Sequence, residues 1–329
     1  MPVCAAATRS VASPFRVRWV LVGAAALLSA GAPKGLCAQG ERRVDPSAAE
    51  LAIAMGRFGL AEAALFEEIR RAPRAPTARG ALGTYLASRG KFQVGITLLE
   101  EAIKFGGDSA QVEARLAEVF RWTVQYDRAA VLVHARLVPE EREAMRRAAG
   151  TTPGGVASST VPLLPNEAFG LGRIWISIGG ERVEADVQPL LTGIQLPATL
   201  ALFSAVEPVG ARGDTTSAVA RTIMIGRTSI GPVPVTLVPS LGTARIGLDV
   251  LAQLTPTFDF AAKTLTVATQ YQAPPQAERW PLLLTFPGVS FVASEGAAPV
   301  LLHSPAGRSA IRGTRWTLDL GTGSIIVER

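Results

Sequence analysis

Acidic residues next to glycine-containing turns are the side chains of this sequence best placed for chemistry. Asp319 follows the strand-like run Arg315-Trp-Thr-Leu318 and is followed closely by Gly321-Thr322. Asp249 and Asp259 are a further candidate, as a pair of carboxylates. Two carboxyl groups held close together do not both ionise, so one can act as general base and the other as general acid on a water molecule. General acid–base catalysis is therefore the first chemistry to consider.

The sequence offers little for other catalytic chemistries. The spacing of its two histidines, His134 and His303, makes no metal cluster, and His134 is most simply a residue on a helix face. No Gly-x-Ser-x-Gly nucleophile elbow, P-loop or dinucleotide fingerprint is present in the sequence. We therefore expect no cofactor and no bound metal.

The elements expected to position Asp249 and Asp259 are a short helix and a hairpin. Residues 244–254 read Ala-Arg-Ile-Gly-Leu-Asp-Val-Leu-Ala-Gln-Leu, whose apolar spacing predicts a short amphipathic helix that ends before Pro256. Two short strands follow at residues 257–260 and 263–267, separated by a turn. Such a corner occurs in many folds, and both carboxylates are then structural.

This corner resembles the closing segment of one lobe of a retropepsin-like aspartic peptidase. That segment has the order apolar-apolar-Gly, an Asp-x-Leu helix, and a hairpin with Asp before an aromatic residue. The resemblance implies a mostly antiparallel β barrel and two carboxylates that share one proton and activate water. It also implies that Asp249 caps or braces the closing helix and that Asp259 ends a strand. The opening hairpin of such a lobe is present as Gly180-Glu-Arg-Val-Glu-Ala-Asp-Val187.

The position that the resemblance assigns to the first catalytic carboxylate is Gln188. Gln188-Pro-Leu190 stands where the family has Asp-Thr-Gly. If Thr192-Gly193 is aligned instead, Leu191 takes the catalytic position, so neither register supplies a carboxylate. A glutamine amide can hydrogen-bond a water but does not take its proton near neutral pH. Asp186, two residues earlier on the same face of the strand, is a weaker substitute.

A second opening motif lies near the end of the sequence. Asp319-Leu-Gly-Thr322 resembles Asp-Thr-Gly-Ala, and residues 280–286 and 299–302 have the patterns of strands in the same lobe. The order then resembles the two lobes of pepsin-like enzymes. Because only residues 325–329 follow, without a flap or a second closing motif, either the sequence is truncated or the lobe is partial. Asp319, with Gly321 and Thr322 as its supporting loop, then needs a second carboxylate from another chain, for instance in a homodimer.

The first 38 residues have the pattern of a secretory signal peptide. Arg16 and Arg18 precede the apolar run 19–30, and Leu36-Cys-Ala38 offers a small residue at a cleavage position. The run is shorter than the ~20 apolar residues of a membrane helix, so we expect no stable span after cleavage. The alternatives are an uncleaved anchor or a lipoprotein formed through Cys37. The pattern indicates a periplasmic or secreted protein of a bacterium.

Cleavage changes the arguments from charge and cysteine content. Four of the 33 basic residues and none of the 27 acidic residues lie in the first 38, so the remainder has a net charge of +2. This value indicates neither a nucleic-acid partner nor an anionic membrane surface. Both cysteines, Cys4 and Cys37, are also removed, which excludes disulfides and thiol catalysis. About 290 residues remain, enough for two domains with hydrophobic cores.

Residues 39–149 are rich in Ala, Leu, Glu and Arg and contain an internal repeat of 34 residues. The repeat is visible in three turn-like segments, Gly56-Arg-Phe58, Gly90-Lys-Phe92 and Val124-Gln-Tyr126. Small residues recur with the same period: Ala49, Gly83 and Ala117, and then Ala61, Gly95 and Ala129. Small residues at these places let two antiparallel helices approach closely. The pattern resembles tetratricopeptide repeats, which implies three degenerate two-helix repeats and a groove for a peptide or protein ligand. The alternative is an ordinary helical bundle.

The composition changes after residue 150. Residues 150–160 are rich in Gly, Ser, Thr and Pro and predict a flexible linker. Alternating apolar runs then predict strands at residues 173–178, 221–225 and 233–238. The sequence thus predicts a multidomain α + β protein with these parts: a signal peptide (1–38), helical repeats (39–149), a linker (150–168), a retropepsin-like lobe (169–270) and a partial second lobe (271–329).

Two functions follow from these observations. In the first, the β part is a degenerate aspartic-peptidase-like domain that binds a peptide or protein, which Gln188 favours. In the second, the chain is an active aspartic endopeptidase that uses Asp319, possible only with a second carboxylate from a partner chain. Asp319 with Gly321 favours the second.

Overall fold

The computed structural model describes residues 47–135, 137–165, 171–202, 206–285, 288–294, 296–311 and 314–328. All of them belong to one compact unit. The predicted signal peptide at residues 1–38 lies outside the described residues. Within the described part of the chain, each helix is too short or too polar to cross a bilayer.

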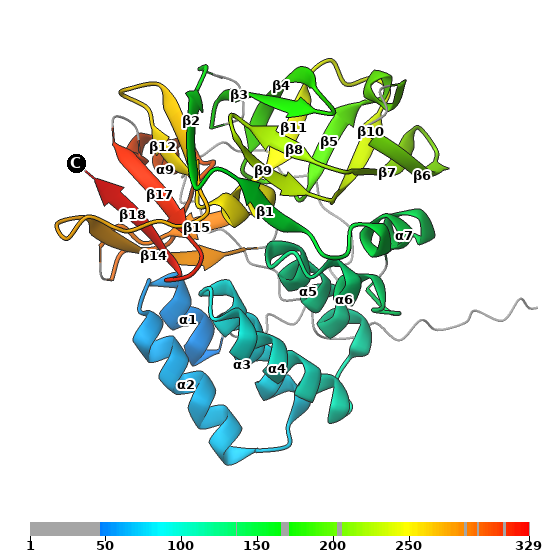
Figure 1. The fold of residues 1–329 in the computed structure, drawn as a ribbon. Coiled ribbons are helices and arrows are strands. Elements are labelled where there is room, and N and C mark those ends of the chain that lie inside the picture. Colours follow the sequence, from blue (N-terminus) through cyan, green and yellow to red (C-terminus); the bar gives the residue numbers. More distant parts are fainter. Residues whose placement is uncertain are drawn as a thin grey trace, which may run out of the picture. The chain divides into compact units, whose positions relative to one another are not determined.

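The first third of the described chain is helical (Figure 1). Its helices are α1 (Ala48–Ala54), α2 (Phe58–Arg71), α3 (Pro76–Ser88), α4 (Phe92–Lys104), α5 (Ser109–Trp122), α6 (Tyr126–Ala130) and α7 (Pro139–Arg147). Ser47 and Glu50 form a capping box on α1, and the Asp108 side chain caps α5. Pro76 and Pro139 begin α3 and α7, where proline has no hydrogen bond to lose.

The predicted repeat is visible in the turns that join α1 to α2, α3 to α4 and α5 to α6. Gly56, Gly90 and Val124 stand at the same place in these turns and have φ angles of 65°, 77° and 49°. This left-handed conformation suits glycine and is unfavourable for a β-branched residue. Val124 therefore adopts the left-handed turn conformation of the first two repeats, although this conformation is unfavourable for valine. The third pair is shortened, because α6 has only 5 residues.

Small side chains bring the paired helices together, as the spacing predicts. A Cβ added to Gly95 of α4 would lie 2.8 Å from the Cβ of Ala87 of α3. A Cβ added to Gly83 would lie 3.0 Å from the carbonyl oxygen of Gly95. At the equivalent places in the other pairs, Ala61 and Ala129 are fully buried. The helix pairs therefore pack through small residues.

The rest of the described chain forms two β-sheets with two short α-helices, α8 (Leu248–Leu251) and α9 (Pro305–Ile311). The 10-stranded sheet has the order β1-β9-β8-β3-β4-β11-β5-β10-β7-β6, and the 8-stranded sheet has the order β16-β15-β14-β18-β17-β12-β13-β2. Neighbouring strands pair antiparallel in both sheets, except that β4 pairs parallel with β11 and β5 pairs parallel with β10 in the 10-stranded sheet. The strand bounds are β1 (Thr152–Gly155), β2 (Ser158–Pro162), β3 (Arg173–Ile178), β4 (Glu181–Gln188), β5 (Ile194–Pro197), β6 (Val206–Arg212), β7 (Thr215–Ala220), β8 (Ile223–Ile225), β9 (Thr228–Gly231), β10 (Val233–Val238), β11 (Ala244–Gly247), β12 (Thr257–Asp259), β13 (Thr264–Ala268), β14 (Glu278–Leu284), β15 (Val289–Phe291), β16 (Val300–Leu301), β17 (Arg315–Asp319) and β18 (Ser324–Glu328).

The segment predicted to be a flexible linker forms strands β1 and β2 instead. β1 pairs with β9 at the edge of the 10-stranded sheet, and β2 pairs with β13 at the edge of the 8-stranded sheet. Its glycines, serines and threonines leave few side chains to bury, which suits edge strands that bond mainly through the backbone. Residues 150–160 therefore connect the two sheets through paired backbone. Residues 166–168 of the predicted linker lie outside the described residues.

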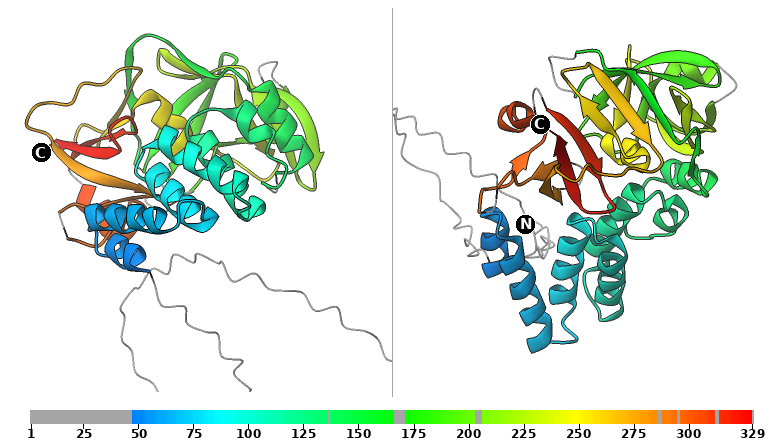
Figure 2. Two further views of the ribbon diagram at one scale, coloured as in Figure 1. Left: turned by 90° about the horizontal axis from the view of Figure 1, so that it is seen from below. Right: turned by 60° about the vertical axis from the view of Figure 1, so that its left-hand side comes forward.

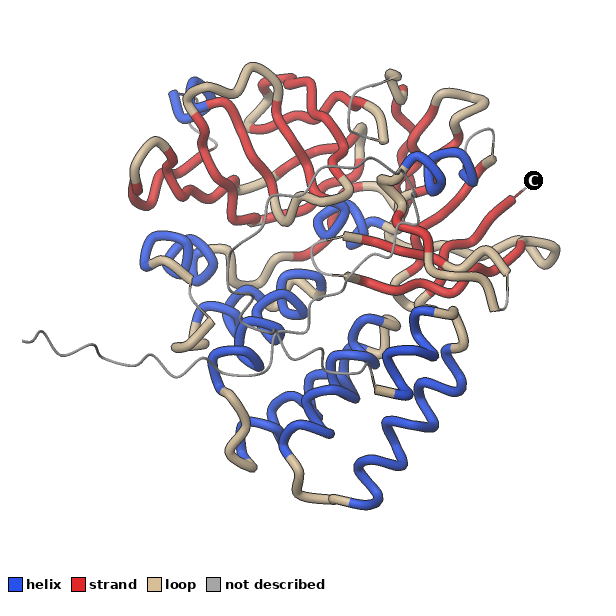
Figure 3. The backbone as a smooth tube through the Cα atoms, turned by 180° about the vertical axis from the view of Figure 1, so that it is seen from behind, coloured by secondary structure: helices blue, strands red, loops and turns tan. Residues whose placement is uncertain are grey.

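The repeat turns contact the β-sheets, and helices and strands share one core. A Cβ on Gly56 would overlap the carbonyl of Ala297, and a Cβ on Gly90 would lie 2.9 Å from the Cα of Gly323. In the third turn the amide of Gln253 donates to the carbonyl of Trp122 at 2.6 Å. The helices gather beside the strands (Figure 3), with α3 next to β14 (Figure 2).

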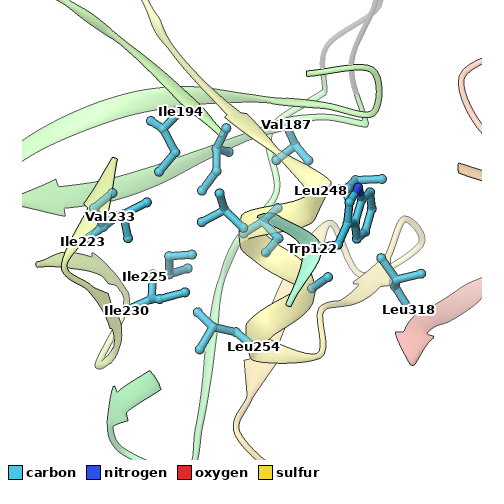
Figure 4. Close-up of a cluster of buried hydrophobic side chains, with 14 of the residues drawn as sticks. Trp122, Val187, Ile194, Ile223, Ile225, Ile230, Val233, Leu248, Leu254 and Leu318 are labelled. Atoms are coloured by element: carbon cyan, nitrogen blue, oxygen red, sulfur yellow. The ribbon is translucent and has the colours of Figure 1, made fainter. Parts of the chain in front are cut away.

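Trp122 is the largest side chain at this junction. It is fully buried with Leu248 of α8 and Leu318 of β17 in one hydrophobic cluster, beside which lie residues of the 10-stranded sheet such as Val187 (Figure 4). Burying a large aromatic side chain contributes several kcal/mol, about 3 to 5 if it is truncated to alanine. The fold class is therefore α + β, as predicted, with helices and sheets joined through a common core.

Candidate functional site

The loop after β4 is the place where the sequence predicts a catalytic group. Gln188 is the last residue of β4 and lies opposite Gly247 in the parallel pairing with β11. The loop returns through Gly193, with a φ of 79°, into β5 at Ile194. Since β11 pairs with both β4 and β5, it holds the loop at both ends. The structure thus places an amide at the end of β4.

Asp249 holds this loop through its carboxylate. The backbone N–H of Gly193 donates to both carboxylate oxygens, at 3.0 and 2.9 Å. The Asp249 residue is only 1% exposed, and burial raises the pKa of its carboxyl to about 6, because the charged form has lost its hydration. The sequence predicted that Asp249 caps or braces the closing helix. The carboxylate joins the loop before β5 to the first turn of α8, because the backbone N–H of Val250 also stabilises it.

Gly247 allows this arrangement. A Cβ at this position would overlap the carbonyl oxygen of Leu191 and the carboxylate of Asp249. The Gly247 N–H also donates to the carbonyl of Gly193 at 2.8 Å. The apolar-Gly pair that carries the resemblance therefore has a local steric reason: the backbone approaches too closely for any side chain.

Asp186 is used in an ion pair. Its Oδ1 accepts the Nε–H of Arg173 at 2.8 Å across the β3–β4 hairpin, and the Asp186 side chain is 16% exposed. The guanidinium also reaches Glu184. Asp186 is thus part of a cross-strand charge pair.

Asp319 lies at the end of β17, and its own turn occupies its carboxylate. Oδ1 accepts the N–H groups of Gly321 and Thr322 at 2.9 and 3.2 Å, and Oδ2 accepts the hydroxyl of Thr322 at 2.7 Å. Asp319 lies opposite Ser324 in the pairing of β17 with β18. Gly321 and Thr322 therefore support Asp319 as the sequence predicts, but within a tight β-hairpin turn.

This turn repeats an earlier one in the chain. Thr257-Phe-Asp-Phe260 and Thr317-Leu-Asp-Leu320 share their threonine and aspartate. In the first hairpin the Asp259 carboxylate accepts the N–H of Ala262 at 2.7 Å, so it too closes a turn after a strand. The order strand, short helix, hairpin also recurs, as β11-α8-β12-β13 and as β16-α9-β17-β18. Asp319 is thus the counterpart of Asp259, and the shared Thr-x-Asp pattern is the sequence signal of this likeness.

The two hairpins lie side by side with an approximate two-fold relation. β12 pairs antiparallel with β17, with Thr257 opposite Thr317 and Phe258 opposite Trp316. The two threonine hydroxyls are 2.7 Å apart and buried. Because equivalent residues meet at the centre of the pairing, the local axis passes between the threonines.

Gln188 and Asp319 lie in different sheets, at the ends of β4 and β17. The Asp319 turn packs against α3–α4: a Cβ on Gly90 would lie 3.0 Å from the carbonyl oxygen of Leu320. The loop after Gln188 instead reaches the β14–β15 connection, where a Cβ on Gly288 would lie 3.0 Å from a methyl carbon of Leu190. The described residues contain no cluster of three or more His, Cys, Asp and Glu side chains suited to a metal ion.

Comparison with known proteins gives a limited likeness. No protein-family model matches the chain, and a search of curated proteins also gave no match. Among solved structures, the chain is weakly similar to the crystal structure of a retropepsin-like aspartic protease from Rickettsia conorii, at 12% sequence identity and a TM-score of 0.26. The matched part covers 36% of this chain and 91% of that protein. A likeness of this size bears on neither activity nor substrate.

Proposed function

We propose that this protein is a secreted or periplasmic, catalytically degenerate aspartic-peptidase-like protein that binds a peptide or another protein. The observation that carries the proposal is the residue at the end of β4. Gln188 stands where the resemblance requires a carboxylate, and an amide does not serve as a general base near neutral pH. In this proposal α1–α6 are three degenerate tetratricopeptide-like repeats, and residues 169–270 are the degenerate lobe.

The environment of Asp319 supports the same proposal. Three donors of its own turn already bind its carboxylate. A dimer that brought two Asp319 turns together would have to displace the contact between Gly323 and the Arg89-Gly90 turn. A dimeric endopeptidase therefore requires a rearrangement of this face, which weighs against that second function even though Asp319 with Gly321 favours it in the sequence.

The helical repeats carry apolar side chains suited to a partner. Leu51 of α1 and Met55, which follows α1, are 48% and 44% exposed, and Leu60 and Phe66 of α2 are 60% and 50% exposed. Val94 of α4, one repeat after Leu60, is 53% exposed. Exposed apolar side chains that recur along a repeat stack are typical of surfaces that bind peptides or proteins.

An assay for acid proteolysis tests the proposal. The purified wild-type protein is incubated with unfolded protein substrate at acid pH, with and without pepstatin, beside the Asp319→Asn variant. We expect no pepstatin-sensitive cleavage by either protein. The triple variant Gln188→Asp, Pro189→Thr, Leu190→Gly should also stay inactive, since the Asp249 carboxylate that contacts this loop is buried and already binds the backbone N–H of Gly193. Cleavage by the wild type that disappears in Asp319→Asn would overturn the proposal and establish the endopeptidase.

A further inference from the structure

A small pocket with a mixed polar and apolar lining lies where the helices meet the 10-stranded sheet. It is enclosed by α5, α6 and α7 on one side and by the loop before β5, strands β7 and β10, and α8 on the other. α7 lies next to β7 and β10 (Figure 1). The space is about 420 Å³ with its solvent-filled mouth included, and its inner part admits only a group of a few non-hydrogen atoms. It is distinct from both the end of β4 and the Asp319 turn.

Tyr126 lines this pocket. The residue is only 2% exposed, and its hydroxyl, which makes no hydrogen bond to another described side chain or carbonyl, is left accessible from the pocket. Tyr85, which is 4% exposed, differs, since its hydroxyl donates to the carbonyl of Phe58 at 2.8 Å. A hydroxyl that faces a pocket without a protein partner generally binds water or a ligand.

Asp249 supplies a buried carboxylate to the pocket. The N–H of Gly193 reaches both of its oxygens, and the backbone N–H groups of Asp249 and Val250 also stabilise it, whereas a carboxylate offers about four acceptor sites. Arg121, which lines the same pocket, pairs with Glu141 and also stabilises the Asp249 carboxylate electrostatically. Within the described residues, no cationic side chain forms an ion pair with Asp249 at hydrogen-bond distance.

The remaining polar lining consists of hydroxyl groups. Thr192, Ser217 and Thr236 line the pocket, and none of their hydroxyls is engaged by another described side chain or carbonyl. Hydroxyl, phenol and carboxylate oxygens all accept hydrogen bonds. Since Arg121 and Glu141 neutralise each other, the charge left in the pocket is that of Asp249. The complementary group is small, positively charged and rich in N–H donors.

We infer that this pocket binds a primary ammonium group, with the Asp249 carboxylate as its counter-ion and Tyr126 and the neighbouring hydroxyls as further acceptors. An ammonium group has three donors, which matches the spread of acceptors around the pocket. The bound ammonium group would then lie between the helices α5 to α7 and the 10-stranded sheet, next to α8. The same group occurs on free amines and at the N-terminus of a peptide.

A titration with methylammonium chloride at constant ionic strength tests this inference. The full chain is labelled with ¹⁵N, and the backbone amide signal of Gly193 reports on the pocket. We expect saturable shifts with a dissociation constant on the order of 10 mM, as the size of this two-atom ligand allows. Tyr126→Phe should weaken binding about tenfold and Asp249→Asn at least as much. Tyr85→Phe is the matched control and should bind like the wild type.

Further arms separate the possible outcomes. Tetramethylammonium has the charge but no N–H donors and should not bind. Glycylglycine amide should bind like methylammonium if the site accepts a peptide N-terminus, and its acetylated form should not bind. Three results would overturn the inference: no saturation up to about 200 mM methylammonium, equal affinity for tetramethylammonium, or unchanged affinity in Tyr126→Phe. None of them depends on whether the protein is a peptidase or binds a protein partner.

Discussion

Asp249 and Asp319 use their carboxylates in the same way in two very different environments. Each accepts backbone N–H groups from a nearby loop or turn, of Gly193 in one case and of Gly321 and Thr322 in the other. Asp249 is 1% exposed beneath the helices, whereas the hydrogen bonds of Asp319 lie at the surface of a hairpin. The comparison teaches that an aspartate beside a glycine-containing loop can be structural in both places. Burial, which the motif does not encode, decides how strongly each aspartate changes the free energy of unfolding.

The largest expected effect comes from the buried member of the pair. The pKa of Asp249 is raised from 3.8 to about 6 in the folded protein. Well below about pH 4 the carboxyl is protonated in both the folded and the unfolded state. Between about pH 4 and pH 6 the unfolded chain has released its proton while the folded protein keeps it, so the free energy of unfolding falls, and it levels off above about pH 6. By pH 7 this single group lowers it by roughly 3 kcal/mol.

Asp249→Asn should remove this pH dependence. The measurement is urea denaturation of the wild type and the variant at about pH 4 and about pH 7. The variant should gain roughly 2 kcal/mol relative to the wild type between the two pH values. A difference in unfolding free energy that is the same at both would contradict the account of Asp249 as a buried charge.

A slightly smaller effect is expected for the glycine beside Asp249. Gly247→Ala places a methyl group against the Leu191 carbonyl and the Asp249 carboxylate, and backbone atoms have little room to move. We expect the free energy of unfolding to fall by about 2 to 3 kcal/mol. Gly242→Ala is the control, because a Cβ there meets no atom within 4 Å. Equal stability of the two variants in urea would mean that the loop before β5 is not held as described.

The smallest effect is expected for the surface member of the pair. Asp319→Ala removes the acceptor for two N–H groups and one hydroxyl of the turn, but water can replace these bonds. We expect a loss of about 1 kcal/mol in the free energy of unfolding. Asp259→Ala in the equivalent hairpin should behave alike, which the same urea measurement checks. A loss in Asp319→Ala larger than that in Gly247→Ala would reverse the comparison.

Local patterns in the sequence predicted most of the elements. The strands at residues 173–178 and 233–238 form as β3 and β10, and the turns with Gly56 and Gly90 join helices at the predicted spacing. The short helix before Pro256 also forms. These features depend on side-chain periodicity and on glycine conformations, which neighbouring residues determine.

The role of Asp319 and the state of residues 150–160 depended on partners far away in the sequence. β2 pairs with residues more than 100 positions later, and the threonine pair Thr257–Thr317 spans 60 positions. A hairpin turn and the opening loop of a lobe can share the letters Asp-x-Gly-Thr, so the motif alone did not separate them. Only the pairing of β17 with β12 and β18 did so.

The sequence by itself determined the 34-residue helical repeat, the main strands and the glutamine at the end of β4, because each depends on local residue types. The tertiary structure decided that helices and sheets share one core, that Asp249 holds the Gly193 loop, and that Tyr126 and Asp249 line one pocket. These outcomes require residues from distant segments to meet, and the free energy that brings them together comes from burying apolar surface over the whole fold.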